Sequence, residues 1–301
     1  MGSPQAREAM NTNRLVYAAL IATTVVWGGS FVAIKHVLQY VTPLQLVLLR
    51  FAPASGVFAA VLCLRHRHVW PRMLRDDWLL LLLSGVSGVF VYHLALNSGE
   101  MTIPAGTASL LMALNPAFIF ALSQLTLREK PTRTQLGGLL LAFVGLVIVV
   151  RFASRETIDF HYLRGVLITL VAPISWAVYT VLSRPLARRY PPLAVTGLST
   201  ILGSLPLAVT VRPILLHTIA VLPWDAWASV AFLALLSTVG GVTVWTFGLQ
   251  ALPAGRVGSF IYLVPLWGAL LSRLMLAEPI SAWFVLGAGI ILAGVMLVHR
   301  G

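Results

Sequence analysis

Long apolar segments separated by short polar stretches follow one another along the whole chain. Crossing the hydrocarbon core of a bilayer takes roughly 20 apolar residues. Backbone N–H and C=O groups must be paired inside lipid, so we expect helices; the segments are too long and too uniformly apolar for barrel strands. The ten predicted spans lie at about 15–34, 44–63, 78–98, 104–127, 135–150, 164–183, 193–211, 227–250, 255–276 and 282–298. Their short loops favour one compact bundle, an all-α membrane protein with ten transmembrane helices.

The second half of the sequence repeats the first at an offset of 149 residues. Pro104-Ala105-Gly106 recurs as Pro253-Ala254-Gly255, and the register holds without a gap to Glu129 and Glu278. Matches at proline, glycine and glutamate are harder to attribute to chance than matches at leucine. The chain is therefore divided into an N-terminal extension at 1–13, expected to be disordered, and two five-helix repeats at 14–151 and 164–300. Because five is odd, the second repeat enters the membrane from the opposite side, which predicts inverted repeats.

Composition excludes a water-soluble fold. The chain is 58% hydrophobic and 10% charged, with a mean hydropathy of +0.90, more apolar surface than such a fold can bury. The net charge of +12 follows from topology and requires no nucleic acid partner. Fourteen Lys and Arg residues fall on the side that holds both termini and six on the other, with Arg50 inside a span. The positive-inside rule then places both termini in the cytoplasm.

Several short segments carry a resemblance to a known family. They are Trp27-Gly28-Gly29-Ser30-Phe31, Leu49-Arg50-Phe51, Ala95-Leu96, Pro104-Ala105-Gly106 with Asn115-Pro116 and Glu129, and Pro253-Ala254-Gly255 with Pro265 and Glu278. Together with the ten-span layout, they resemble the EamA-type unit of the drug/metabolite transporter superfamily over essentially the whole chain. That superfamily moves amino acids, nucleotide sugars, sugar phosphates and cations. Among its branches the chain looks most like the exporters of aromatic and neutral amino acids, which implies a multi-pass protein of the bacterial inner membrane.

The acidic residues are informative because of where they fall. All nine Asp and Glu lie in loops, at span ends or in the N-terminal extension. A small multidrug exporter of the same superfamily uses a carboxylate inside the membrane, and this chain has no equivalent at mid-span. A cationic substrate would lack a charge partner there, so a neutral or zwitterionic substrate fits better. With no G-x-x-x-x-G-K-[ST] sequence for ATP, we expect a uniporter; ion coupling through His93 or backbone carbonyls stays open.

Two charged or titratable residues inside spans each allow two interpretations. His93, beside Tyr92, could make a helix–helix hydrogen bond or line a cavity as a pH-sensitive donor; Asn97, one turn later, favours a polar lumen. Arg50 could snorkel outward or cap a facing helix terminus, or it could guide a substrate carboxylate.

Aromatic residues within spans could pack against lipid or stack on a substrate side chain. The candidate substrate-binding residues are Trp27, Ser30, Tyr92, His93, Asn97, Asn115, Trp176, Tyr179, Trp245 and Tyr262. The candidate hinges are Gly28, Gly29, Pro116 and Pro265, which could instead be simple kinks.

The sequence therefore predicts a secondary transporter that exports neutral and aromatic amino acids by alternating access around a central cavity. A transporter of another small metabolite is the alternative, although a nucleotide sugar or sugar phosphate would require several cations in the lumen. A lipid-moving or structural membrane protein is the alternative of another class. An intramembrane enzyme would need a nucleophile–base pair or a metal cluster, so we expect no enzyme. We expect no cofactor or metal; the partners are the substrate and membrane lipids, with a monomer or weak dimer as the assembly.

Overall fold

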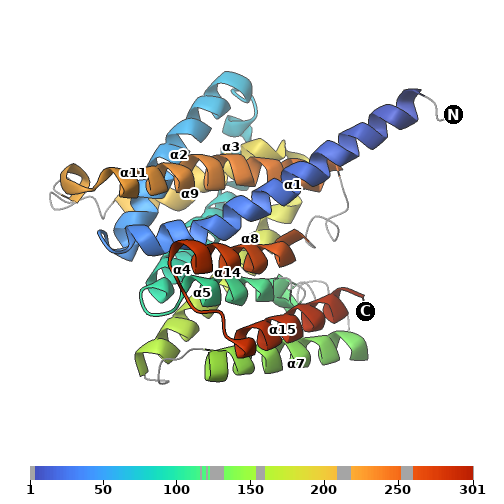
Figure 1. The fold of residues 1–301 in the computed structure, drawn as a ribbon. Helices are drawn as coiled ribbons and strands as arrows, with labels where there is room; N and C mark the ends of the chain where they lie inside the picture. Colours follow the sequence, from blue (N-terminus) through green and yellow to red (C-terminus); the bar gives the residue numbers. More distant parts are fainter. Residues whose placement is uncertain are drawn as a thin grey trace.

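The fold is that of a computed structural model. It describes residues 4–115, 117–119, 121–122, 132–153, 160–208, 218–251 and 260–300. Every secondary-structure element in these ranges is a helix, and none is a strand (Figure 1). The prediction of an all-α fold is confirmed.

The elements in chain order are α1 (Pro4–Val37), α2 (Pro43–Arg65), α3 (Trp70–Gly85), η1 (Val86–Val91), α4 (Tyr92–Glu100), α5 (Ala105–Leu111), η2 (Met112–Leu114), α7 (Arg133–Ile148), η3 (Val149–Ala153), α8 (Phe160–Arg189), α9 (Pro192–Ala208), α11 (Trp224–Ala231), η4 (Phe232–Gly241), α12 (Val242–Ala251), η5 (Phe260–Leu263), α14 (Val264–Met275) and α15 (Ala282–Arg300). The first helix begins at Pro4, so it includes most of the expected N-terminal extension.

Helices of two lengths occupy the positions of the predicted spans. Within the described ranges, five are long and apolar enough to cross a membrane: Leu15–Val37, Pro43–Arg65, Trp70–Glu100, Phe160–Arg189 and Trp224–Trp245. Five shorter apolar helices take the other positions: Ala105–Ile119, Arg133–Ile148, Pro192–Ala208, Phe260–Met275 and Ala282–Gly294. The chain is therefore a multi-pass membrane protein. The third of these helices begins at Trp70, earlier than the predicted start at 78, because one further helical segment precedes the non-helical residue Asp77.

Local sequence fixes where two of these helices begin. Thr42 accepts a hydrogen bond from the backbone N–H of Gln45 at 3.3 Å, and the Gln45 side chain accepts the Thr42 N–H at 2.8 Å. Thr132 and Gln135 form the same reciprocal pair at the start of α7. Such a capping box satisfies two N–H groups that the first turn of a helix leaves unpaired.

Glycines that correspond in the repeat pack the fifth and tenth span positions together. Figure 1 shows α7 and α15 side by side at one edge of the molecule. A Cβ on Gly145 would lie 2.8 Å from the carbonyl oxygen of Gly287, and a Cβ on Gly294 would lie 2.6 Å from that of Gly138. Gly145 corresponds to Gly294, and Gly138 to Gly287, at the offset of 149. One contact is thus the copy of the other across a pseudo-two-fold axis, and only glycine permits this closeness.

The irregular helical segments recur in the same way. The π-helix η1, shifted by 149 residues, falls within the π-helix η4, and the 3₁₀ segment η2 falls within η5. The repeat observed in the sequence is therefore also a repeat of local backbone geometry. These four segments lie around the cavity between the two halves of the chain.

Candidate functional site

A cavity lies where the two halves of the chain meet. It contains about 930 Å³ of space not filled by protein atoms, which includes open solvent. Its walls come from α1, α2, η1 and α4, the η2 region, α8, α9, η4 with α12, and η5 with α14. These are the first four span positions of each repeat. The helices α7 and α15 contribute no described lining residue.

Most of the lining residues form pairs separated by 149 positions. The pairs are Trp27 and Trp176, Ser30 and Tyr179, Arg50 and Ser199, Phe51 and Thr200, Gly88 and Ser237, Val89 and Thr238, His93 and Val242, Met112 and Ile261, and Asn115 and Val264. A cavity lined by both members of each pair must straddle the axis that relates the repeats. This is where a transporter built from repeats is expected to bind its substrate.

Contacts across the cavity follow the same symmetry. Ser30 donates a hydrogen bond to the Ser237 hydroxyl at 2.8 Å. The equivalent contact joins Tyr179 to Gly88, where an added Cβ would lie 2.6 Å from the Tyr179 ring. At one side of the cavity the two repeats therefore contact each other through two hydroxyls. At the equivalent place on the other side they contact each other through an aromatic ring that packs on a glycine.

The polar side of the cavity centres on Arg50, which α2 points at the π-helix η4. Its Nε donates to Thr238 Oγ1 at 2.8 Å and its Nη2 to Ser237 Oγ at 3.0 Å. The residue is only 7% exposed, and within the described ranges no carboxylate lies within ion-pair distance of it. Arg50 therefore neither snorkels outward nor caps a helix terminus. π-Helical segments of this kind are often found at functional sites.

The aromatic side is a continuous run of rings that begins beside Arg50. Phe51 contacts His93 with ring centroids 4.5 Å apart, and His93 contacts Tyr92 at 4.6 Å. The run continues from Tyr92 to Trp176 at 5.3 Å and from Trp176 to Tyr179 at 5.0 Å. T-shaped and tilted rings at these distances pack favourably and provide a continuous aromatic surface.

The structure brings seven of the sequence-predicted binding residues together at this cavity. They are Trp27, Ser30, Tyr92, His93, Asn115, Trp176 and Tyr179. Asn97 does not line it, because its amide faces α2 and donates to the Pro43 carbonyl at 3.3 Å. Trp245 lies behind Trp27, with ring centroids 5.2 Å apart, and Tyr262 is buried in the core.

Arg50 lines the cavity but is missing from the residues selected from the sequence. The sequence did contain an indication of its role, because Arg50 is the one Lys or Arg that lies well inside a predicted span. The offset of 149 was a second signal, since pairs of polar or aromatic residues at that spacing mark the lining.

The hinge candidates have different surroundings. A Cβ on Gly28 would lie 2.5 Å from Trp267 Cβ and 2.9 Å from the Gly268 nitrogen. Gly28 therefore allows α1 and α14 to approach closely, and α1 continues through both Gly28 and Gly29 without a break. Pro265 lies in the first turn of α14, directly after the 3₁₀ segment η5. Pro116 lies outside the described residues.

Two carboxylates belong to residues near the beginning of α5. Glu278 accepts the backbone N–H groups of Ala105 at 3.0 Å and Gly106 at 3.1 Å, so it caps α5 from the other repeat. Glu100, at the end of α4, is fully buried, and its carboxylate accepts no hydrogen bond from the described residues. Lys35 donates to the carbonyls of Glu100 and Ile103 at 2.6 and 2.8 Å. Glu100 is thus buried although it lies just beyond the end of a predicted span.

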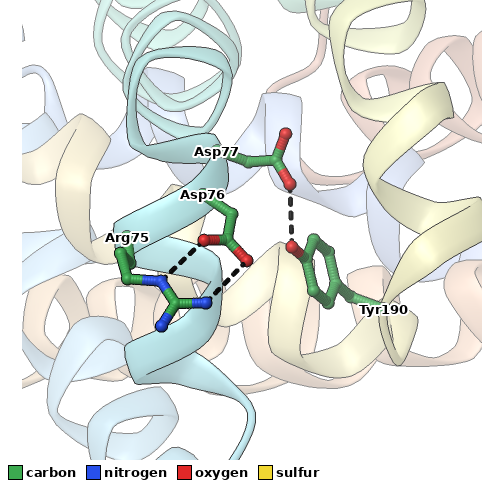
Figure 2. A network of polar contacts seen from close by, with 4 residues as sticks. All are labelled: Arg75, Asp76, Asp77 and Tyr190. Carbon is green, nitrogen blue, oxygen red and sulfur yellow. Dashed lines mark hydrogen bonds and ion pairs between the residues drawn. The ribbon is translucent and has the colours of Figure 1, made fainter.

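A separate polar network joins the end of α8 to an irregular turn of α3. Figure 2 shows Tyr190 directed at Asp77 and Arg75 paired with Asp76. Tyr190 donates to Asp77 Oδ2 at 2.8 Å and Arg189 to Asp77 Oδ1 at 3.1 Å. The Asp77 backbone is non-helical, at φ −135° and ψ 23°. The hydrogen bond to Asp77 raises the pKa of the Tyr190 phenol above its ordinary value. None of these residues lines the cavity.

Metal ligands do not gather in the described part of the chain, where no group of three or more His, Cys, Asp or Glu side chains could hold an ion. The cavity instead offers hydroxyls, one guanidinium and aromatic rings. These groups can bind a small molecule that has a polar end and an apolar end.

Comparison with known proteins identifies the family. A protein of Archaeoglobus fulgidus described as an uncharacterized transporter is 32% identical, over 94% of this chain and 98% of its own length. A probable terminal-alkyne amino-acid exporter of Streptantibioticus cattleyicolor is 30% identical, over 97% and 95%. A probable amino-acid metabolite efflux pump of Escherichia coli is 26% identical, over 92% of each chain.

A solved crystal structure shares the fold, with a TM-score of 0.63 at 22% sequence identity over 93% of this chain and 96% of that one. The family model of the EamA-like transporters matches the chain twice, at residues 14–151 and 163–300. The chain therefore belongs to the EamA-like transporter family.

Proposed function

We propose that this protein exports neutral and aromatic amino acids across the bacterial inner membrane by alternating access. The observation that carries the proposal is the composition of the cavity. A guanidinium with two hydroxyls forms one side, and a run of aromatic rings extends from it. An amino acid with an apolar side chain has the same division into a charged head and an apolar body.

The names of two relatives support this substrate class. One is called a probable terminal-alkyne amino-acid exporter and the other a probable amino-acid metabolite efflux pump. Both are matched over more than nine tenths of this chain. A nucleotide sugar or sugar phosphate fits less well, because such anions require several cations and Arg50 supplies the one Lys or Arg of the described lining.

The symmetry of the lining supports alternating access. If the two repeats exchange conformations, each residue takes the place of its counterpart 149 positions away. The paired lining residues then remain around the substrate in both states, while access changes sides. The charge distribution of the sequence, with more Lys and Arg on the side of the termini, supports cytoplasmic termini and an inverted second repeat.

Uptake of radiolabelled tryptophan, phenylalanine and leucine into liposomes that contain the purified protein tests the proposal. We expect saturable uptake that an imposed pH gradient leaves unchanged. Trp176→Ala should reduce uptake of tryptophan at least tenfold because it removes the ring that lies between Tyr92 and Tyr179. Trp224→Ala is the matched control, since Trp224 is 83% exposed on α11 and away from the cavity. Folded protein that takes up none of the three amino acids would contradict the proposal and favour the lipid-moving or structural alternative.

A further inference from the structure

Arg50 has hydrogen-bonding capacity that the described part of the protein does not use. A guanidinium has five N–H groups, and two of them donate to Ser237 and Thr238. No other acceptor and no paired carboxylate is found for it among the described residues. Glu100 acts on it electrostatically from a greater distance. A buried charge is costly unless it is paired, so a guanidinium that lines a cavity without a carboxylate partner and with unused N–H groups is suited to an anionic ligand.

The hydroxyls around Arg50 hold it in a fixed position. Thr238 donates its own proton to the Leu233 carbonyl at 2.9 Å, so its oxygen is left to accept from Arg50 Nε. Ser237 Oγ accepts from Arg50 Nη2 and from Ser30. Trp27 Nε1 in turn donates to the Ser237 carbonyl at 3.1 Å. A guanidinium held in advance loses less freedom when it binds a ligand.

The charge breaks the symmetry of the cavity. Arg50 corresponds to Ser199, which is paired with Ser84 at 3.0 Å and carries no charge. Asn115 corresponds to Val264, and the Asn115 Oδ1 atom accepts no hydrogen bond from the described residues. Two chemically different sides around one axis can distinguish the two ends of a substrate. The aromatic run starts at Phe51, the residue next to Arg50 in the chain, so the apolar surface begins beside the charge.

We propose that Arg50, Ser237 and Thr238 form a carboxylate-binding subsite that sets the orientation of the substrate. The α-carboxylate lies on the free edge of the Arg50 guanidinium, and the side chain lies along the ring run toward Trp176 and Tyr179. This assignment rests on the proposed function for its amino-acid substrate, and its own content is the requirement for a carboxylate.

A carboxylate could belong to an amino acid or to an acid without an amine. Three indole compounds distinguish these sources: tryptophan, tryptamine without the carboxylate, and indole-3-propionate without the amine. Binding to purified wild-type protein is measured as the ligand-dependent rise in unfolding temperature. Uptake of each labelled compound into liposomes is measured in parallel. We expect tryptophan to bind best and tryptamine at least tenfold more weakly.

Arg50→Gln should remove this preference. The apparent dissociation constant for tryptophan should rise about ten- to hundredfold, the loss expected for a hydrogen bond to a charged group, while that for tryptamine should stay the same. The dissociation constant of Arg50→Lys for tryptophan should lie between those of the wild type and Arg50→Gln, because lysine keeps the charge but not the bidentate geometry of the guanidinium. If Arg50→Gln does not fold, Thr238→Val tests the same subsite by releasing Nε. Arg164→Gln is the matched control, since Arg164 is exposed on α8.

Each possible result has a definite meaning. If tryptophan is transported but tryptamine binds wild-type protein equally well, or if Arg50→Gln keeps the preference, the carboxylate subsite is overturned and amino-acid transport stands. If indole-3-propionate binds and is transported while tryptophan is not, the subsite stands and the proposed substrate class fails. If none of the three compounds affects folded wild-type protein, both proposals are overturned.

Discussion

Ser55 donates a hydrogen bond to Ser204 at 3.2 Å, and these two residues are each other's counterparts in the repeat, 149 positions apart. A contact between counterparts must lie on the pseudo-two-fold axis. When the repeats exchange conformations, every off-axis contact is replaced by its copy, but this one maps onto itself. The Ser55–Ser204 contact, between α2 and α9, is therefore a fixed point of the proposed transport cycle.

A disulfide at this point should leave transport active. Ser55→Cys with Ser204→Cys, on a Cys63→Ser background that removes the natural thiol, should oxidise to a cross-linked protein that keeps at least half of its tryptophan uptake. The control pair is Ser84→Cys with Ser199→Cys, also in contact at 3.0 Å but not counterparts, so its cross-link should block uptake until it is reduced. Equal inhibition by both cross-links would contradict an exchange about this axis.

The Glu278 cap should stabilise the state in which α5 is held against the opposite repeat. Glu278→Gln keeps one acceptor oxygen and loses the charge, so it should lower the free energy of unfolding by about 1 kcal/mol, the usual value of a helix cap. The measurement is thermal unfolding of the purified protein in detergent. Asp76→Asn, which breaks an exposed pair with Arg75, should have almost no effect. Equal stability of Glu278→Gln and the wild type would show that the cap is not needed.

Gly88 should be essential for the shape of the cavity. A Cβ there would lie 2.6 Å from Tyr179 Cδ2 and 2.8 Å from Cγ, so Gly88→Ala must displace the last ring of the aromatic run. We expect at least tenfold weaker uptake of tryptophan with a smaller change for alanine, which does not need the ring surface. Gly137→Ala is the control, since nothing lies within 4 Å of its added Cβ. Unchanged kinetics in Gly88→Ala would remove Tyr179 from the proposed site.

Glu100→Gln should fold at least as stably as the wild type. Its carboxylate is fully buried and has no hydrogen-bond donor among the described residues, and an unpaired buried polar group is costly. Glutamine has nearly the same shape without the charge. Thermal unfolding and tryptophan uptake, with and without a pH gradient, check this. A large loss of stability would contradict this prediction and show that the Glu100 charge is needed to stabilise the charge of nearby Lys35.

The helical fold could be predicted from the sequence because long apolar segments can pair their backbone groups inside lipid only as helices. The repeat could be recognised because the two halves align at one constant offset. Seven lining residues were also predicted, since aromatic and polar residues inside apolar spans are conspicuous. Side-chain direction was the part that periodicity could not supply. The spans are apolar on most faces, so nothing in the sequence distinguished Asn97, directed at α2, from Asn115 at the cavity.

Arg50 and Glu100 show that the burial of a charged side chain could not be predicted from the sequence either. Distance from the end of a span indicates depth in the membrane and not burial by neighbouring helices. Arg50 is held inward by hydroxyls that come from a residue stretch almost two hundred positions later, and Glu100 is covered by elements packed around the end of α4. Only the tertiary arrangement brings those partners together.

The π-helix η4 has an evolutionary consequence. A π segment accommodates an extra residue in a turn of an α-helix, and each residue added to or removed from a helix rotates the remainder of that helix by about 100°. Loss of one residue before Ser237 would therefore turn both hydroxyls away from Arg50 while leaving every amino acid of the cavity in the chain. Relatives with identical lining residues can in this way differ in substrate through the length of one turn, a change that comparing residues position by position would miss.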